Sequence, residues 1–110
     1  MAKKIIIPLF GDEVAPRFDL ATEVCVIEQG PGGEVLEERS LVLPQASAEQ
    51  LCHLIITEGI HAVICGGIEE EYYQFLTWKR VEVVDAVIGP WRRAAERYLE
   101  GILRPGDVVL

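Results

Sequence analysis

The chain has 110 residues, of which 50% are hydrophobic and 25% are charged, a composition typical of one globular domain and not of a disordered chain. Its net charge of −8 disfavours binding to nucleic acid or to an anionic membrane surface. Three cysteines without a CxxC pair form neither a disulfide framework nor a zinc ribbon. Because the first apolar run, Ile5–Ile7, is too short for a signal peptide, we expect a cytoplasmic protein.

Three β-strands are predicted in the N-terminal half, over residues 3–7, 23–28 and 34–43. Pro8 cannot donate to a strand ladder, so we expect it to end the first strand and to begin a loop over residues 9–20. The glycine-rich turn at residues 30–33 predicts an antiparallel hairpin of the second and third strands. Consecutive charges at residues 37–39 suit the third strand to a sheet edge.

The C-terminal half is predicted to alternate helices, over residues 48–58, 68–80 and 90–104, with strands, over residues 61–65 and 81–88. Ser47 is predicted to cap the first helix by accepting from the backbone N–H of Gln50, and Gly59 to end it. Pro90 is predicted to open the last helix, which carries an apolar stripe from Trp91 to Ile102 and leaves a short tail.

The predicted element order is therefore β-β-β-α-β-α-β-α. Helical connections between the later strands require parallel pairing with right-handed crossovers. We therefore predict one α/β domain over residues 1–110, with a mixed five-stranded sheet. Near-continuous aliphatic runs in its strands indicate a sheet that is covered by helices on both faces.

A ligand site is expected where the carboxyl ends of the parallel strands meet, at the loops of residues 10–19, 66–67 and 89–90. The first loop is long and combines Phe10, Arg17, Phe18 and Asp19, a mixture suited to binding. In the alternative interpretation, Phe10 and Phe18 close the end of the core, and Arg17 pairs with Asp19 or Glu13. The sequence leaves both interpretations open.

Gly66 and Gly67 precede a predicted helix, as in an anion-binding turn. Three glutamates at residues 69–71 would repel a phosphate there, which favours a simple tight turn. Cys65 ends the preceding strand at the expected crevice and is the candidate metal ligand, with a buried structural cysteine as the alternative. The cysteines and histidines do not have zinc-ligand spacing.

Motifs of hydrolases and metalloproteases, such as GxSxG and HExxH, are absent from the sequence. The first predicted strand also lacks the carboxylates with which metal-dependent nucleases hold their ions. We therefore expect a protein that is not an enzyme.

Four segments resemble the dinitrogenase iron–molybdenum cofactor biosynthesis family, also called the nitrogenase accessory factor-like domain. They read IIIPLFG (residues 5–11), VAPRFDLA (14–21), VICGGI (63–68) and AVIG with YLEGIL (86–89 and 98–103). The resemblance implies a three-layer α/β fold with ribonuclease H-like topology and without nuclease activity. It also implies a protein that binds or carries iron–sulfur or iron–molybdenum cofactor precursors.

One position departs from that family. Members that handle the cofactor typically place a histidine before the phenylalanine of the first loop, where this chain has Arg17. A guanidinium stays protonated and cannot ligate iron, but it can hydrogen-bond an anion or a carboxylate.

The predicted function is thus a non-enzymatic binding or carrier module, with an iron–sulfur or iron–molybdenum cluster or another anionic ligand as partner. Its predicted cofactor-binding residues are Phe10, Arg17, Phe18, Asp19, Cys65, Gly66 and Gly67, with Cys65 as the metal ligand. The alternative is a protein-interaction or regulatory module that has lost cluster binding. Its contact face or homodimer seam would combine Tyr72, Tyr73 and Trp78 with residues 108–110.

Overall fold

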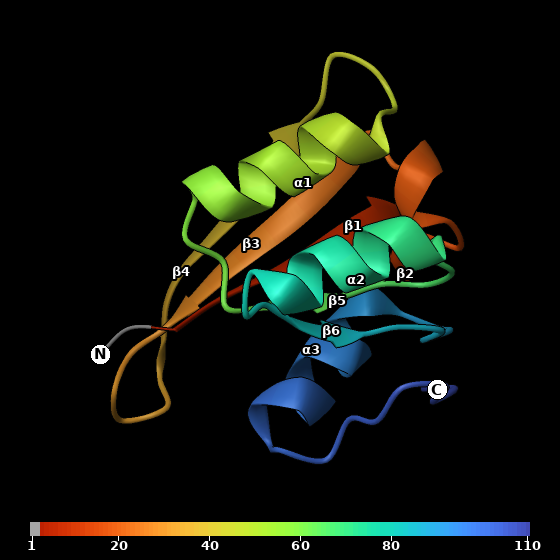
Figure 1. Ribbon diagram of the computed structural model, residues 1–110. Coiled ribbons are helices and arrows are strands. Elements are labelled where there is room, and N and C mark those ends of the chain that lie inside the picture. The colour runs from red at the N-terminus through yellow and green to blue at the C-terminus, as the bar shows by residue number, and fades with distance from the viewer. Residues whose placement is uncertain (1–2) are drawn as a thin grey trace.

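The computed structural model describes residues 3–110 as a mixed β-sheet with helices packed on it (Figure 1). The strands are β1 (Lys3–Phe10), β2 (Glu13–Val14), β3 (Glu23–Gln29), β4 (Val35–Val42), β5 (Ala62–Ile64) and β6 (Glu82–Val84). The helices are α1 (Ala48–Thr57), α2 (Glu70–Trp78) and α3 (Trp91–Leu99), and a single 3₁₀ turn, η1, spans Phe18–Leu20. In the described part of the chain, no helix is long and apolar enough to cross a membrane.

The sheet follows the order β4-β3-β1-β5-β6, with the short β2 paired to β1. Strand β3 is antiparallel to both of its neighbours, β1 and β4, whereas β1, β5 and β6 run parallel. This arrangement confirms the predicted α/β class, the mixed sheet and the edge position of the third long strand. The prediction of five strands omitted β2, which makes the sheet six-stranded.

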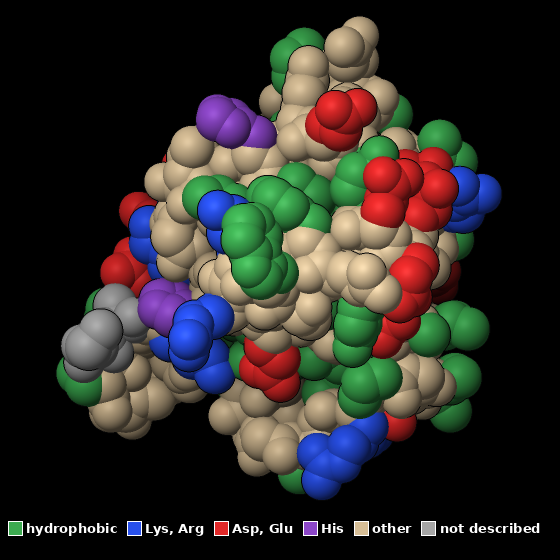
Figure 2. Space-filling model, viewed as in Figure 1, with side chains coloured by type: hydrophobic (Ala, Val, Ile, Leu, Met, Phe, Trp, Pro, Cys, Tyr) green, Lys and Arg blue, Asp and Glu red, His purple; other side chains and the backbone are tan. Residues whose placement is uncertain are grey.

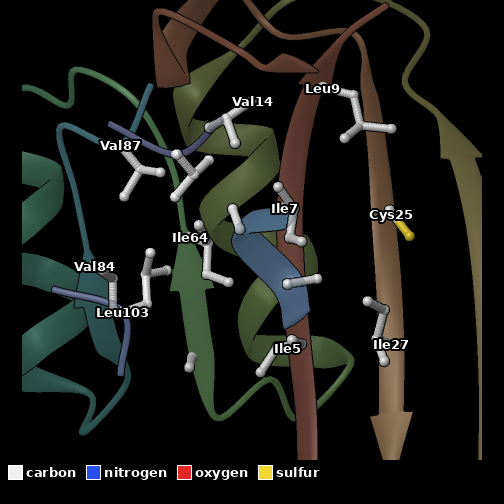
Figure 3. Close-up of a cluster of buried hydrophobic side chains, with 14 residues drawn as sticks. Ile5, Ile7, Leu9, Val14, Cys25, Ile27, Ile64, Val84, Val87 and Leu103 are labelled. Atoms are coloured by element: carbon white, nitrogen blue, oxygen red, sulfur yellow. The ribbon is translucent and has the colours of Figure 1, made fainter. Parts of the chain in front are cut away.

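Alternating side chains of the central strands belong to two hydrophobic clusters, one on each face of the sheet. On one face, Ile5 and Ile7 of β1 lie with Ala94 and Ala95 of α3 in a buried cluster whose strand side chains Figure 3 shows. On the other face, Ile6 packs in a cluster with residues of α1 and α2. The result is a three-layer molecule, in which α1 and α2 cover one face and α3 covers the other (Figure 1).

The helix α1 begins and ends at the predicted signals. The Ser47 hydroxyl accepts a hydrogen bond of 3.2 Å from the Gln50 N–H, which satisfies one of the free donors of the first turn. Gly59 adopts a φ of +68°, a left-handed conformation that glycine reaches without steric cost, and it ends the helix as predicted.

The prediction that Pro8 ends the first strand was wrong, because β1 continues to Phe10 and Pro8 pairs with Val24. The Pro8 carbonyl accepts from the Ala15 N–H at 2.8 Å, on the side away from β3. Since the N–H and C=O of a strand residue point to the same side, the donor that proline lacks would also point away from β3. The β1–β3 ladder therefore loses no hydrogen bond at Pro8.

Three predicted elements of the C-terminal half are shorter in the structure. The strand predicted over residues 81–88 is β6, which ends at Val84. The chain leaves the sheet before Ile88, because Ala86 adopts a φ of +58°. The helix predicted over residues 68–80 spans only Glu70–Trp78. The last helix ends at Leu99, close to the left-handed Gly101, and not at Pro105.

Part of the segment after α3 is built into the core, so this segment is not a free tail. Val109 is buried with an exposed fraction of 1%, whereas its neighbour Val108 is 62% exposed. Val108 pairs with Ile88 in a parallel bridge, and the Val109 N–H donates to the Ile88 carbonyl at 2.8 Å. Gly89 permits this approach, because a Cβ there would lie 2.8 Å from Cγ2 of Val109 and still closer to its carbonyl oxygen. The segment of residues 108–110 therefore closes one face of the sheet, and Val109 is unavailable for the predicted contact face.

We predict that Val109→Ala lowers the free energy of unfolding by about 2 kcal/mol, because it removes two buried methyl groups and leaves a cavity. The matched variant Val108→Ala should change it by less than about 0.5 kcal/mol, since that side chain is exposed. Urea denaturation followed by circular dichroism measures both. Equal effects of the two variants would contradict the docking of this segment.

Candidate functional site

The three loops that were predicted to meet do meet, through backbone hydrogen bonds. The Gly67 N–H donates to the Pro16 carbonyl at 2.7 Å, and the Phe18 N–H donates back to the Gly67 carbonyl at 2.8 Å. The Val14 N–H donates to the Gly89 carbonyl at 3.0 Å. These hydrogen bonds hold the segment of residues 14–18 across the carboxyl ends of β1, β5 and β6.

Gly66 is the closest point of this contact. A Cβ on Gly66 would lie 2.6 Å from the Pro16 carbonyl oxygen and nearer still to that of Ala15, a separation that real Cβ atoms do not show. Because the Gly67 N–H already donates to Pro16, this turn does not present it to an anion. The geometry favours the tight-turn interpretation of Gly66 and Gly67 over the phosphate-binding one.

Two of the predicted site residues lie in the core. Phe18 is 1% exposed and stacks on Tyr72 with 6.4 Å between ring centroids. Cys65 has no exposed surface. Burial, with a smaller contribution from the nearby Asp85 carboxylate, raises the pKa of the Cys65 thiol to about 12, so the thiol stays protonated at neutral pH. In this conformation, an iron–sulfur or iron–molybdenum cluster in solution cannot contact the Cys65 sulfur.

Arg17 and Asp19 form a two-point ion pair on the surface. Arg17 Nε donates to Oδ1 of Asp19 at 3.0 Å, and Nη2 donates to Oδ2 at 2.8 Å. The hydrogen bond from Arg17 lowers the pKa of the Asp19 carboxyl below its ordinary value, so the pair holds at neutral pH and is lost as the pH falls through that lowered pKa. The alternative interpretation of this loop, in which Arg17 pairs with Asp19 or Glu13, is therefore correct about the ion pair, and the partner is Asp19.

The alternative interpretation was wrong about Phe10, which does not close the end of the core. Its side chain is 72% exposed, and Leu20, across the loop, is 62% exposed. Between them lies a cleft of about 280 Å³. It is lined by Leu9, Phe10, Ala15, Pro16, Arg17, Leu20, Ala21 and Thr22. Arg17 is the one charged residue in this lining, so the cleft offers apolar walls and a single guanidinium.

The predicted site is thus divided by the loop. Phe10, Arg17 and Asp19 lie on its outer side with the cleft, whereas Phe18, Cys65 and Gly66 lie on its inner side. The sequence analysis missed Leu20 as a site residue. Leu20 follows the charged Asp19 in a loop, and an apolar residue there gives no periodic signal that separates cleft lining from core.

The side chains that could ligate a metal are dispersed over the described residues. Among residues 3–110, no group of three or more His, Cys, Asp or Glu side chains is arranged to hold a metal ion. Arg17, where the resemblance described above implies a histidine, carries a guanidinium that donates hydrogen bonds and cannot ligate iron.

Residues 1–101 match the family described as dinitrogenase iron-molybdenum cofactor, and the chain belongs to this family. The family is linked to the iron–molybdenum cofactor of dinitrogenase, which agrees with the resemblance of the four segments. No curated protein matches the chain.

Solved structures support the same fold. The crystal structure of the protein PH0822 superposes with a TM-score of 0.82 at 19% identity, covering 93% of each chain. A Methanocaldococcus jannaschii protein (mj0327), provisionally described as a dinitrogenase, gives 0.75 at 22% identity over 94% of this chain and 93% of its own. A Thermotoga protein (TM1290), provisionally described as a NifB protein of the DUF35 family, gives 0.72 at 16% identity over 94% and 92%. At these identities the likeness establishes the fold.

We predict that Gly66→Ala destabilises the protein by about 1–3 kcal/mol, because two backbone oxygens must move to admit the methyl group. Gly67→Ala is the matched control, since its Cβ would lie 3.3 Å from the Pro16 oxygen and needs only a small shift. Urea denaturation gives the stabilities, and amide exchange at Phe18 reports whether the loop has detached. A Gly66 variant as stable as the Gly67 variant would argue against the close contact.

Proposed function

We propose that this chain is a non-enzymatic module that binds or carries an iron–sulfur or iron–molybdenum cofactor precursor, with the cleft beside Arg17 as its docking point. The observation that carries the proposal is the pairing of an exposed apolar cleft with one guanidinium on the long loop of a member of this family. Its three free cysteines suit a reducing compartment such as the cytoplasm.

In this proposal the cargo is held by its outer atoms. Arg17 uses Nε and one Nη2 hydrogen on Asp19, so Nη1 and the second Nη2 hydrogen remain as donors toward an anionic group in the cleft. Phe10 and Leu20 supply apolar contact on either side. The predicted ligand Cys65 would join the cargo only if the loop around Gly66 opened.

We further propose that the domain has the ribonuclease H-like topology implied by the family resemblance. An antiparallel meander of β1, β3 and β4 followed by the parallel β5 and β6 on the other side of β1 supports this assignment. Helices on both faces support it as well.

Metal carriage is tested by anaerobic purification from cells supplied with iron and molybdenum, followed by metal analysis and a visible spectrum. We expect stoichiometric iron and a charge-transfer absorption band. Cys65→Ala should retain both if the cargo is held from outside, and should lose both if the thiolate ligates it. A colourless, metal-free protein that also fails anaerobic reconstitution would contradict the carrier function.

The role of Arg17 is tested with the reconstituted protein by measuring iron retention during gel filtration. Arg17→Ala should weaken retention about tenfold or more, because it removes charge-assisted hydrogen bonds worth about 1.5–3 kcal/mol. Asp19→Asn should strengthen retention, since it removes the carboxylate that competes for the guanidinium. Arg104→Ala, an exposed cation that is absent from the cleft lining, is the control for net charge. If Arg17→Ala and Arg104→Ala behave alike, the docking point is misplaced.

A groove between α1 and α2 favours the second candidate function, a protein-interaction module. It has a volume of about 730 Å³, and hydrophobic side chains gather over it in Figure 2. Trp78 is 73% exposed at its rim, with Phe75 and Ile56 beside it. Of the other residues of the predicted contact face, Tyr72 also lines the groove, whereas Tyr73 is absent from its lining and Val109 is buried elsewhere. Metal-free protein whose partner binding is lost in Trp78→Ala would favour this function.

A further inference from the structure

Strand β4 is an open edge of the sheet. It is eight residues long and pairs with β3 on one side, and within residues 3–110 no other strand pairs with its outer side. The Leu43 N–H donates inward to the Thr22 carbonyl, and backbone direction alternates along a strand. The N–H and C=O groups of Glu38, Ser40 and Val42 therefore point outward, away from β3. Such an edge is a template for another strand.

We propose that β4 pairs antiparallel with β4 of a second copy of this chain, so that two sheets join into one across a twofold axis. The occupant is argued from the sequence of the strand, Val-Leu-Glu-Glu-Arg-Ser-Leu-Val, which has apolar residues at both ends and charges at its centre. Run antiparallel against itself about its central residues, it places Val35 of one copy opposite Leu41 of the other, with Leu36 and Val42 as diagonal neighbours.

The charges select one register. A twofold axis normal to the sheet requires one residue to face its own copy, and facing side chains must share a sheet face. With Glu38 at the centre, Glu37 of each copy faces Arg39 of the other, at the spacing where unlike charges stabilise a strand pair. Shifting the centre to Arg39 sets two guanidinium groups against each other, and shifting it to Glu37 opposes two carboxylates. Neither alternative sets Arg39 opposite an acidic residue, whereas the register centred on Glu38 forms two such unlike pairs, which offset its own facing carboxylates.

The arrangement of the existing ion pairs agrees with this register. Arg39 lies on the α1 face, where it contacts Glu58 at 2.7 Å and Glu37 at 3.0 Å. Glu37 is therefore on the same face and already oriented toward a guanidinium. The like-charged Glu38 pair at the centre is on the opposite face, where Arg92 of each copy contacts its own Glu38 at 3.2 Å. Each central carboxylate thus brings its own counter-charge.

Charges in the middle of an exposed edge normally oppose pairing with other strands. Here they oppose unrelated strands but match a second copy, which makes the edge selective. The dimer contact consists of β4 residues, none of which lines the Arg17 cleft. The proposal is therefore independent of whether the cleft carries a cluster.

Sedimentation velocity over a concentration series up to about 1 mM tests the dimer. Wild-type protein should shift from the 12.2 kDa monomer to twice that mass as concentration rises. The outward amides of Glu38 and Ser40 should exchange more slowly with deuterium at high concentration. A wild-type chain that stays monomeric throughout overturns the proposal.

Two variants test the register. Ser40→Pro removes an outward donor while sparing the β3–β4 ladder, and should abolish the dimer, whereas Ser40→Ala keeps the donor and the dimer. Glu37→Lys should weaken the dimer about tenfold, because two attractive cross-strand pairs become repulsive. Glu100→Lys makes the same change in net charge far from β4 and should not weaken it.

Circular dichroism and thermal unfolding of each monomer confirm that the fold survives the substitution. A dimer that persists in Ser40→Pro, or that responds equally to Glu37→Lys and Glu100→Lys, means that another surface joins the copies and overturns the assignment to β4.

Discussion

The backbone contact between residues 14–18 and the two glycine turns is the constraint on which the candidate site depends. In an open α/β sheet, the crevice beyond the carboxyl ends of the strands is the usual place for a ligand. Here Pro16 and Phe18 are hydrogen-bonded to Gly67, and the missing Cβ of Gly66 lets the loop lie directly on the strand ends. The protein fills its own crevice, and the accessible cleft lies on the outer side of the loop.

The same contact explains why the Cys65 thiol is buried and protonated at neutral pH. The thiol follows β5 at the strand end that the loop covers, so it loses its solvent and its pKa rises to about 12. A cysteine with its pKa raised by burial is a poor nucleophile and a poor metal ligand until it is exposed. Any thiolate chemistry at Cys65 is thus coupled to opening of the loop, whereas binding at Arg17 is not.

Much of the fold could be predicted because its signals are local. The aliphatic runs of β1 and β3, the glycine turn between β3 and β4, and the Ser47 cap each lie within a few residues of the element that they define. The short β2 and β6 span only two and three residues, and the docking of Val109 depends on Ile88, a partner distant in sequence. No periodic pattern marks them, since two or three residues are too few to show one.

The site shows the same division. Topology alone brought the three loops together, because strand ends that share a sheet edge must meet. The side on which each side chain lies could not be predicted, since it depends on hydrogen bonds that fix the loop. Phe10 and Phe18 are the same residue type in one loop, yet one is 72% exposed and the other 1%. Pairing of Phe18 with Gly67 turns its ring inward, and Phe10, at the end of β1, is left outside.

Electrostatics bear on how firmly such a cleft can hold an anion. The chain carries a net charge of −8, and the one cation in the cleft lining is already engaged by Asp19. An anionic cargo therefore meets a repulsive background and a partly neutralised guanidinium, both of which weaken its binding. For an enzyme or a storage protein this would be a defect. For the carrier that we propose, which must pass its cargo on, weak binding through outer contacts permits release without the breaking of a metal–protein bond.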